Sequence, residues 1–344
     1  MADPMADPMA DQAVDPTAHR GARTGRRRQL PAPHTLLGYA VLAGTVAAYA
    51  GFYRHQLQHF PTPYDYTSVI DAALPLVFAA IGQSLVVLTG GIDLSVGGIM
   101  SLCVGLAALH LDGGPGGVAG WLVVVPLVGA VAGAVNGVLV ARGRLAPILV
   151  TLATLSVYDG LALKVLPEPG GSVSARVTEV LANPNAPVGL AYVALAVAAW
   201  WVLRRTRFGM NVYALGSDEA AARAVGVPVD RVKVCVYAAA GLCYGLAALF
   251  YTATTTSGDP NAGNSYILTS IAAVVIGGIA LAGGRGSAMG AVAGAFALTL
   301  VVDVLFFAGI DQQYEAFFQG LFLIVAVLLG SAVTVLARRR KGTS

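Results

Sequence analysis

The stretch TSVIDAALPLVFAAIGQSLVVLTGGIDLSVGGIMSLCVGLAALH, residues 67–110, decides the fold. It holds two long apolar runs that are separated only by the turn GGID at residues 90–93. A membrane-spanning helix needs about 20 mostly apolar residues, and the run 67–88 meets that length. The stretch therefore predicts membrane-spanning helices rather than the core of a soluble domain.

The composition of the whole chain agrees with this. The protein has 344 residues, of which 56% are hydrophobic and 11% are charged, whereas soluble domains carry about 25% charged residues. The three cysteines, Cys103, Cys235 and Cys243, lie in apolar segments without metal-ligand spacing. We therefore expect an all-α polytopic membrane protein with buried thiols and no metal site.

Ten apolar runs are candidates for spans. They cover residues 35–53, 67–88, 94–110, 118–140, 145–165, 187–203, 233–252, 267–283, 288–308 and 315–336. Glycines recur inside them at G-x-x-x-G spacing, as in Gly129–Gly133 and Gly290–Gly294. This spacing favours close helix packing in lipid.

The basic residues test this topology independently. With ten alternating helices and a cytoplasmic N-terminus, only Arg54, Lys164 and Arg176 of the 21 Lys and Arg fall on the outer side. Cytoplasmic loops of membrane proteins carry an excess of Lys and Arg. The distribution therefore predicts about ten transmembrane helices, with both termini in the cytoplasm.

Three regions follow from this pattern. Residues 1–30 form a cytoplasmic tail that contains two copies of MADP and a group of arginines, and we expect residues 1–20 to be disordered. Residues 31–338 form the transmembrane domain, and residues 339–344 form a second cytoplasmic tail.

The longest cytoplasmic connection, residues 204–233, contains the sequence SDEAAARAVG. It predicts a short helix capped by Ser217 or Asp218, with Glu219 in its first turn and Gly226 at its end. The small Ala220 and Ala221 suit docking into a groove on another protein. An ordinary amphipathic loop helix is the alternative interpretation.

The turn GGID suggests two roles for its aspartate. Asp93 can cap the helix that begins at Leu94, with help from Ser95. A charge near membrane depth is costly and often marks a pathway or a partner, so a role in a substrate passage also stays open.

Four stretches together resemble the ribose/xylose/galactoside-type family of ABC sugar permeases: LTGGIDLSVGG (88–98), VNGVLVARGRLAPILVTLATL (135–155), RFGMNVYALGSDEAAARAVGV (207–227) and SIAAVVIGGIALAGGRGS (270–287). The resemblance implies a bacterial inner-membrane importer subunit that pairs with a second permease chain. It also implies a separate ATPase subunit, an extracytoplasmic sugar-binding protein, and a coupling role for the helix 217–226. The sequence departs from the family at Asp71 and at Ile267 and Thr269.

A phosphate-binding loop of the form G-x-x-x-x-G-K-[ST] is absent from the sequence. We therefore expect the chain to bind no cofactor itself and to depend on ATP hydrolysed by its partner. No nucleic-acid partner is expected. Two alternatives stay open: an ion-coupled secondary carrier, which Asp71, Asp159 and Asp303 in or near apolar runs would suit, and a permease of the same fold for another solute such as a nucleoside.

Candidate site residues fall into two further groups. Residues with polar side chains in or beside the apolar runs are candidates for the substrate passage: Asp71, Asp93, Ser95, Asn136 and Asp159. The outer loop TTTSGDPNAGNSY (254–266) offers candidate contacts to the binding protein: Asp259, Asn261 and Asn264. That loop can equally be a plain turn-rich connection.

Overall fold

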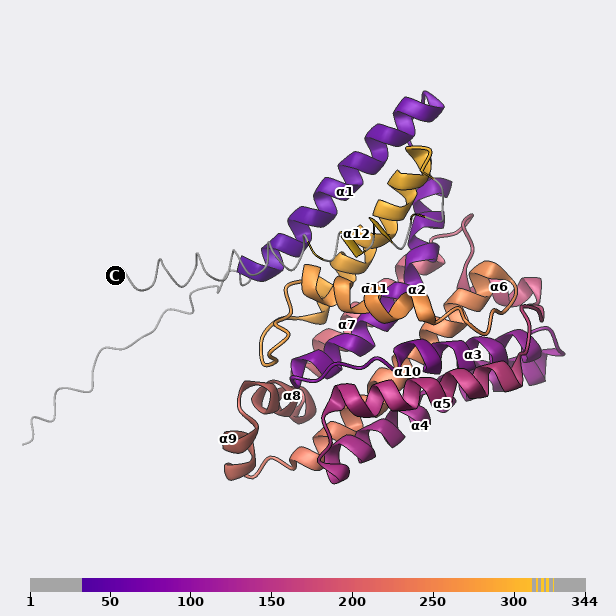
Figure 1. The fold of residues 1–344 in the computed structure, drawn as a ribbon. Helices are drawn as coiled ribbons and strands as arrows, with labels where there is room; N and C mark the ends of the chain where they lie inside the picture. The colour runs from indigo at the N-terminus through magenta and orange to yellow at the C-terminus, as the bar shows by residue number, and fades with distance from the viewer. Residues whose placement is uncertain (1–32, 311–313, 315–316, 319, 322–323, 325–344) are drawn as a thin grey trace, which may run out of the picture. The chain divides into compact units, whose positions relative to one another are not determined.

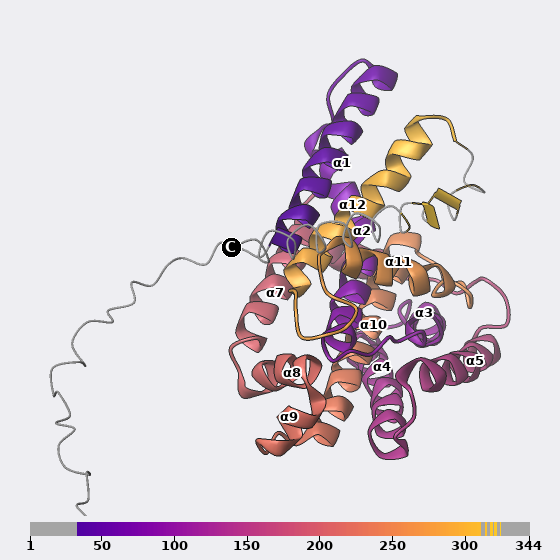
Figure 2. The same cartoon turned by 60° about the vertical axis from the view of Figure 1, so that its left-hand side comes forward.

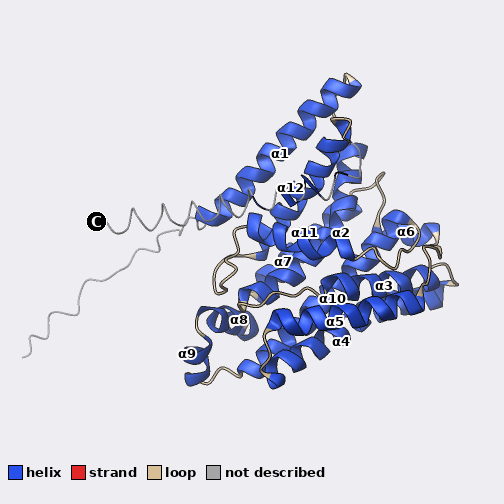
Figure 3. Cartoon of the chain, in the orientation of Figure 1, coloured by secondary structure: helices blue, strands red, loops and turns tan. Residues whose placement is uncertain are grey.

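The computed structural model describes residues 33–310 and, beyond them, residues 314, 317–318, 320–321 and 324. Both predicted tails, 1–30 and 339–344, lie outside the described residues, as does most of the predicted run 315–336. The described part of the chain consists of helices joined by loops and turns, and its one extended pairing is an isolated bridge between Gly170 and Gly258 (Figure 3). The predicted all-α class is confirmed.

The helices follow one another along the chain as shown in Figure 1. They are α1 (Pro33–Leu57), α2 (Pro63–Leu88), α3 (Val96–His110), α4 (Pro115–Gly143), α5 (Pro147–Val165), α6 (Ala175–Leu181), α7 (Val188–Leu203), α8 (Arg207–Ser217), α9 (Glu219–Ala224), α10 (Val229–Thr255), α11 (Asn264–Ile276) and α12 (Ala288–Phe307).

Five of the described helices are long and apolar enough to cross a membrane: α2, α4, α5, α10 and α12. The pair α7–α8 passes the same test together but is bent by 75°, which allows up to six spans. Helices α3 and α11 are apolar but have only 15 and 13 residues. A multi-pass helical protein is thus confirmed, while the count of ten spans stays a prediction.

The predicted run 267–283 was too long. Helix α11 ends at Ile276, and a loop follows in which Gly278, Gly283, Gly284 and Gly286 have positive φ angles. These left-handed conformations end the helix although the residues around them are apolar.

Glycines join α4 to α10 in an antiparallel pair. Gly137 lies against Val234, Gly133 against Tyr237 and Gly129 against Gly241. A Cβ atom added at Gly133 would lie 2.1 Å from the carbonyl oxygen of Tyr237, so only glycine fits there. The close packing predicted from the G-x-x-x-G spacing is present at this helix pair.

Helix α2 lies in the interior, and 83% of its most apolar stretch of 18 residues is buried. The corresponding stretches of α4 and α5 are only 33% and 28% buried. In Figures 1 and 2, α2 runs through the middle of the helices while α5 lies at one edge. The outer helices therefore offer the apolar surface that faces lipid or partner chains.

Candidate functional site

The break between α2 and α3 places polar backbone groups in the interior. Thr89 ends α2, Gly90 has a φ angle of +81°, and helix α3 begins only at Val96. The backbone N–H of Leu94 donates to the hydroxyl of Thr151 on α5 (3.1 Å). Buried backbone groups need such partners because an unmade hydrogen bond is costly away from water.

Asp93 accepts hydrogen bonds from the donors of Ser95, which follows in this break. Its Oδ1 accepts hydrogen bonds from the backbone N–H (2.9 Å) and the hydroxyl (2.6 Å) of Ser95. The expectation that Asp93 caps a helix starting at Leu94 was wrong in register, because Ser95 is the N-cap residue and makes no side-chain capping bond itself. The Asp93 carboxylate still accepts hydrogen bonds at the start of α3, from Ser95, which lies two residues further along the chain.

A buried polar network extends from Asp93 in both directions. On one side, Asn136 of α4 donates to the hydroxyl of Ser95 (2.7 Å), and the Tyr158 hydroxyl lies 3.4 Å from Asn136 Oδ1. On the other side, the Tyr244 hydroxyl lies 3.1 Å from Gln83 Oε1 and 3.3 Å from Asp93 Oδ2. The network thus joins α2, α4, α5 and α10 through the helix break.

Three predicted passage residues, Asp93, Ser95 and Asn136, meet in this network. Each of them is 0% exposed, so none faces an open passage in this conformation. Gln83, Tyr158 and Tyr244 also belong to the network and were not predicted from the sequence. Their only signal is that they are polar groups inside apolar runs.

The other two predicted passage residues lie apart from the network. Asp71 on α2 is 4% exposed, and its carboxylate lies against Gly189 at the start of α7. Asp159 follows Tyr158 on α5, and its Oδ1 is buried and has no hydrogen-bond partner among the described residues. The structure therefore does not bring the five predicted residues together in one site.

Helix α9 forms where the sequence predicts a short cytoplasmic helix. Of the two candidate caps, Asp218 takes the role, because its carboxylate accepts from the backbone N–H of Ala221 (2.9 Å). The Ser217 hydroxyl instead donates to the carbonyl of Tyr213. Residues 207–217 form a helix of their own, α8, which the sequence analysis did not predict.

Gly226 ends α9 as predicted. It has a φ angle of +86°, its N–H donates to the carbonyl of Arg223, and the N–H of Val227 donates to that of Ala222. This pair of bonds is a Schellman motif, which requires a residue with positive φ at this position. The boundaries of α9 are therefore fixed by Asp218 and Gly226.

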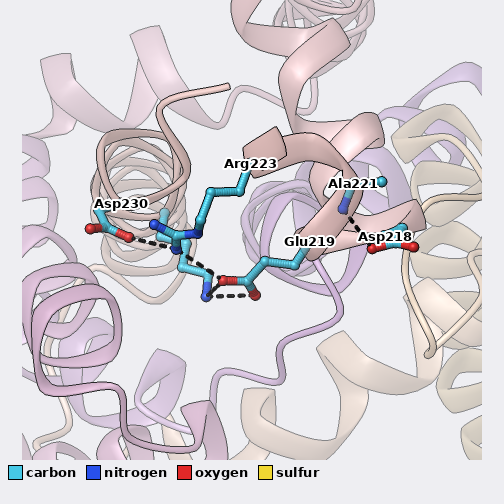
Figure 4. A network of polar contacts seen from close by, with 6 residues as sticks. Asp218, Glu219, Ala221, Arg223 and Asp230 are labelled. Carbon is cyan, nitrogen blue, oxygen red and sulfur yellow. Dashed lines mark hydrogen bonds and ion pairs between the residues drawn. The ribbon is translucent and has the colours of Figure 1, made fainter. Parts of the chain in front are cut away.

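Ion pairs hold α9 against the start of α10 (Figure 4). Lys233 donates to both oxygens of Glu219 at 2.9 Å, and Arg223 lies 3.1 Å from Asp230 and 3.4 Å from Glu219. The hydrogen bond to Asp230 and the neighbouring carboxylates raise the pKa of Arg223. Glu219 is thus engaged within its own chain, while Ala220 and Ala221 remain exposed.

The basic residues gather at one end of the described helices. The end of α2 meets the loop after α11, since Gly284 donates to Leu88 at 2.9 Å, and the Tyr213 hydroxyl of α8 donates to Gly286 at 2.8 Å. The antiparallel α4–α10 pair brings the end of α4 to the start of α10. We call this the basic end; its Lys and Arg are Arg142, Arg144, Arg204, Arg205, Arg207, Arg223, Arg231, Lys233 and Arg285.

The opposite end carries the loop 254–266. Gly258 pairs with Gly170, and Gly263 donates to the Ser101 hydroxyl of α3. Of the predicted contact residues, Asp259 accepts from the N–H of Asn261, and Asn264 begins α11; Asn261 and Asn264 are exposed. The loop is anchored at its glycines and presents its polar side chains outward.

Comparison with known proteins identifies the family. Residues 66–327 match the family described as the branched-chain amino acid transport system / permease component. The chain is 37% identical over 270 residues to the ribose import permease protein RbsC of Bacillus subtilis, covering 73% of this chain and 79% of the relative. No solved structure matches.

Two further relatives agree. RbsC of Escherichia coli K12 is 35% identical over 262 residues, which cover 73% of this chain and 80% of the relative. The autoinducer 2 import system permease protein LsrC of Yersinia pseudotuberculosis is 36% identical over 267 residues, 75% of each chain. The resemblance found in the sequence is confirmed. The chain belongs to the branched-chain amino acid transport-system family of ABC permease components, and it is a multi-pass protein of the bacterial inner membrane.

Proposed function

We propose that this chain is the translocation subunit of an importer for a simple sugar, a pentose, a hexose or a related compound. The observation that carries the proposal is the exposed helix α9, which is fixed at the basic end beside α10 and lies in a chain 35–37% identical to ribose and autoinducer 2 import permeases. The proposal includes a separate ATPase subunit that docks on α9 and hydrolyses the ATP. The chain itself has no phosphate-binding loop.

The proposed contact with the ATPase involves the exposed small residues of α9. Ala220 and Ala221 leave room for a close approach, and Ala222 is buried beneath them. Because Glu219 already pairs with Lys233, its role in this proposal is to hold α9 in place. Asp218 and Gly226 set the two ends of the docking helix.

The proposed orientation places the basic end in the cytoplasm. Arg54, Lys164 and Arg176 lie on or beside α1, α5 and α6 at the opposite end, in agreement with the excess of Lys and Arg in cytoplasmic loops. In this orientation the chain has about ten spans and both termini inside. Asp259, Asn261 and Asn264 face a sugar-binding protein outside.

The proposed passage lies between this chain and a second permease chain. A sugar offers hydroxyl groups, so polar side chains such as those of Asp71 and Asp159 suit it. The buried Asp93–Ser95–Asn136 network becomes accessible to a sugar only when the surrounding helices separate. We assign to it the control of that opening.

Uptake of a panel of labelled solutes into proteoliposomes tests the proposal. The panel contains ribose, xylose, galactose, autoinducer 2 and a nucleoside, and the vesicles contain the permease with its ATPase and binding protein. We expect ATP-dependent uptake of a sugar. Uptake that needs a proton or sodium gradient instead of ATP would favour a secondary carrier, and selective uptake of the nucleoside would replace the substrate class.

A further inference from the structure

A shallow apolar groove of about 640 Å³ lies where α7 turns into α8. It is lined by Leu195, Ala198, Ala199, Val202, Leu203, Thr206 and Phe208. Thr206 is the polar member, and its hydroxyl is already used: it donates to Leu203 and accepts from the N–H of Gly209. The groove therefore offers hydrocarbon contact and no free hydrogen-bonding group.

Helix α7 is peripheral. Only Gly189 and Trp200 are buried along its 16 residues, and Leu195 is 67% exposed. Figure 2 shows α7 along the left edge of the helices, with α8 below it. The 75° bend between the two helices is what a span makes when the chain leaves the membrane and continues along its surface.

Three arginines stand at this bend: Arg204, Arg205 and Arg207. All three are exposed, and none takes part in an ion pair found among the described residues. Residues 188–217 contain no Asp or Glu. The groove thus opens beside positive charge that no acidic side chain neutralises in the part of the chain that the structure describes.

An exposed tryptophan marks the membrane boundary at the same place. Trp201 is 49% exposed, and the Arg205 guanidinium lies 3.3 Å from the centroid of its ring. Tryptophan is enriched at the level of lipid headgroups. Its side chain therefore places the arginines at headgroup depth and the groove just below, among the acyl chains.

From these observations we propose that the α7–α8 bend is a binding site for an anionic phospholipid. One acyl chain lies in the groove, and the phosphate group accepts hydrogen bonds from Arg204, Arg205 and Arg207. Guanidinium groups suit phosphate oxygens because their donors match them in pairs. The site retains an anionic lipid beside the helices that lead to α9.

Quenching of tryptophan fluorescence by brominated lipids tests the proposal. The chain has three tryptophans; Trp121→Phe removes the one that is distant from the groove and leaves Trp200 and Trp201 as reporters. The full-length protein is placed in phosphatidylcholine nanodiscs that contain brominated phosphatidylglycerol or, at the same fraction, brominated phosphatidylcholine. The measured quantity is the ratio of the two degrees of quenching.

We expect a ratio well above one, since each arginine near the membrane surface favours an anionic lipid by roughly fivefold. Replacing Arg204, Arg205 and Arg207 together with Gln should bring the ratio close to one. Ala199→Phe, which fills the groove and keeps every charge, should lower it as well. Unchanged quenching by brominated phosphatidylcholine shows that these variants remain folded in the bilayer.

The matched control removes the same charge at the same end. Replacing Arg142, Arg144 and Arg231 with Gln should leave the ratio high. An equal loss in this control would show a general surface field and would overturn the site. A quenching ratio near one for the protein that keeps all its arginines would also overturn the site. So would loss of the preference for phosphatidylglycerol when the ATPase subunit binds, because this face would then contact a protein partner.

Discussion

Asp93 lies where α2 ends and α3 has not yet begun, and it is wholly buried. A buried charge is stable only when hydrogen bonds compensate for its lost hydration. Here the compensation comes from the N–H and hydroxyl of Ser95 and from the Tyr244 hydroxyl. The carboxylate therefore holds the helix break together and does not line an open passage.

Replacing Asp93 tests this structural role. Asp93→Ala leaves the Ser95 donors unpaired, and each unsatisfied buried group costs about 1–3 kcal/mol, so the Tm of the detergent-solubilised permease should fall by several degrees. Asp93→Asn keeps an acceptor oxygen in place and should lower the Tm less. If Asp93→Ala keeps its Tm but loses affinity for the sugar, Asp93 contacts the substrate directly.

Helix α9 shows how two residues fix a short element. Six residues make less than two turns, and such a helix is not stable by itself in water. Asp218 supplies a partner for an N–H at its start, Gly226 adopts the left-handed conformation at its end, and Lys233 holds Glu219 to α10. Local capping and the ion pairs Lys233–Glu219 and Arg223–Asp230 thus define α9.

Ser217 and Asp218, the two polar residues that precede α9, provide a matched pair of variants. Asp218→Ala removes the cap, which is worth about 1 kcal/mol, and amide exchange over residues 219–225 should become roughly fivefold faster. Ser217→Ala removes a hydroxyl that bonds Tyr213 and caps nothing, so exchange should stay the same. Equal exchange in both variants would mean that packing alone holds α9.

Sequence patterns predicted elements whose causes are local. The cap and terminator of α9 follow from residue types at fixed spacing, and the glycine spacing in α4 indicated its close packing. The early end of α11 also has a local cause, the left-handed conformation of Gly278, but it was missed because the residues around this glycine are apolar. Hydropathy alone extends that run to residue 283.

The sequence predicted some residues of the candidate site but not their burial or their distant partners. Asp93, Ser95 and Asn136 were identified as polar groups in or beside apolar runs, but their burial was not predicted. Tyr244, which bonds Asp93, lies 151 residues away along the chain. A contact at that distance is set by helix packing, which no local pattern in one sequence encodes.

At the scale of the whole molecule, the distribution of charge is the most informative feature. The fold brings the loop after α4, helices α8 and α9, and the loop after α11 to one end, and each of them carries arginine. The same arginines are predicted to be cytoplasmic from the order of the apolar runs alone. The gathering of these residues at one end agrees with that assignment, while the orientation itself stays a prediction from the excess of Lys and Arg in cytoplasmic loops.

Accessibility labelling checks that orientation. A cysteine at Ser217 in a chain whose native cysteines are replaced by Ala should react with a membrane-impermeant maleimide only after the cells are opened, because the end of α8 is cytoplasmic in the proposed topology. A cysteine at Asn261 should react in intact cells. The reverse labelling pattern would invert the orientation.

We propose that movement of a separate ATPase reaches the spans through α9. The most direct measurement combines co-purification of the ATPase with uptake of labelled sugar for Ala221→Arg, since Ala221 is exposed on α9. Ala146→Arg is the matched control: it places the same charge on an exposed alanine at the basic end, in the connection between α4 and α5.

A bulky charge in a closely packed contact is costly. We therefore predict that the Ala221→Arg permease reaches its normal level in the membrane, no longer co-purifies with the ATPase and no longer supports uptake, while Ala146→Arg retains both. Normal ATPase binding and full uptake by Ala221→Arg would contradict the account.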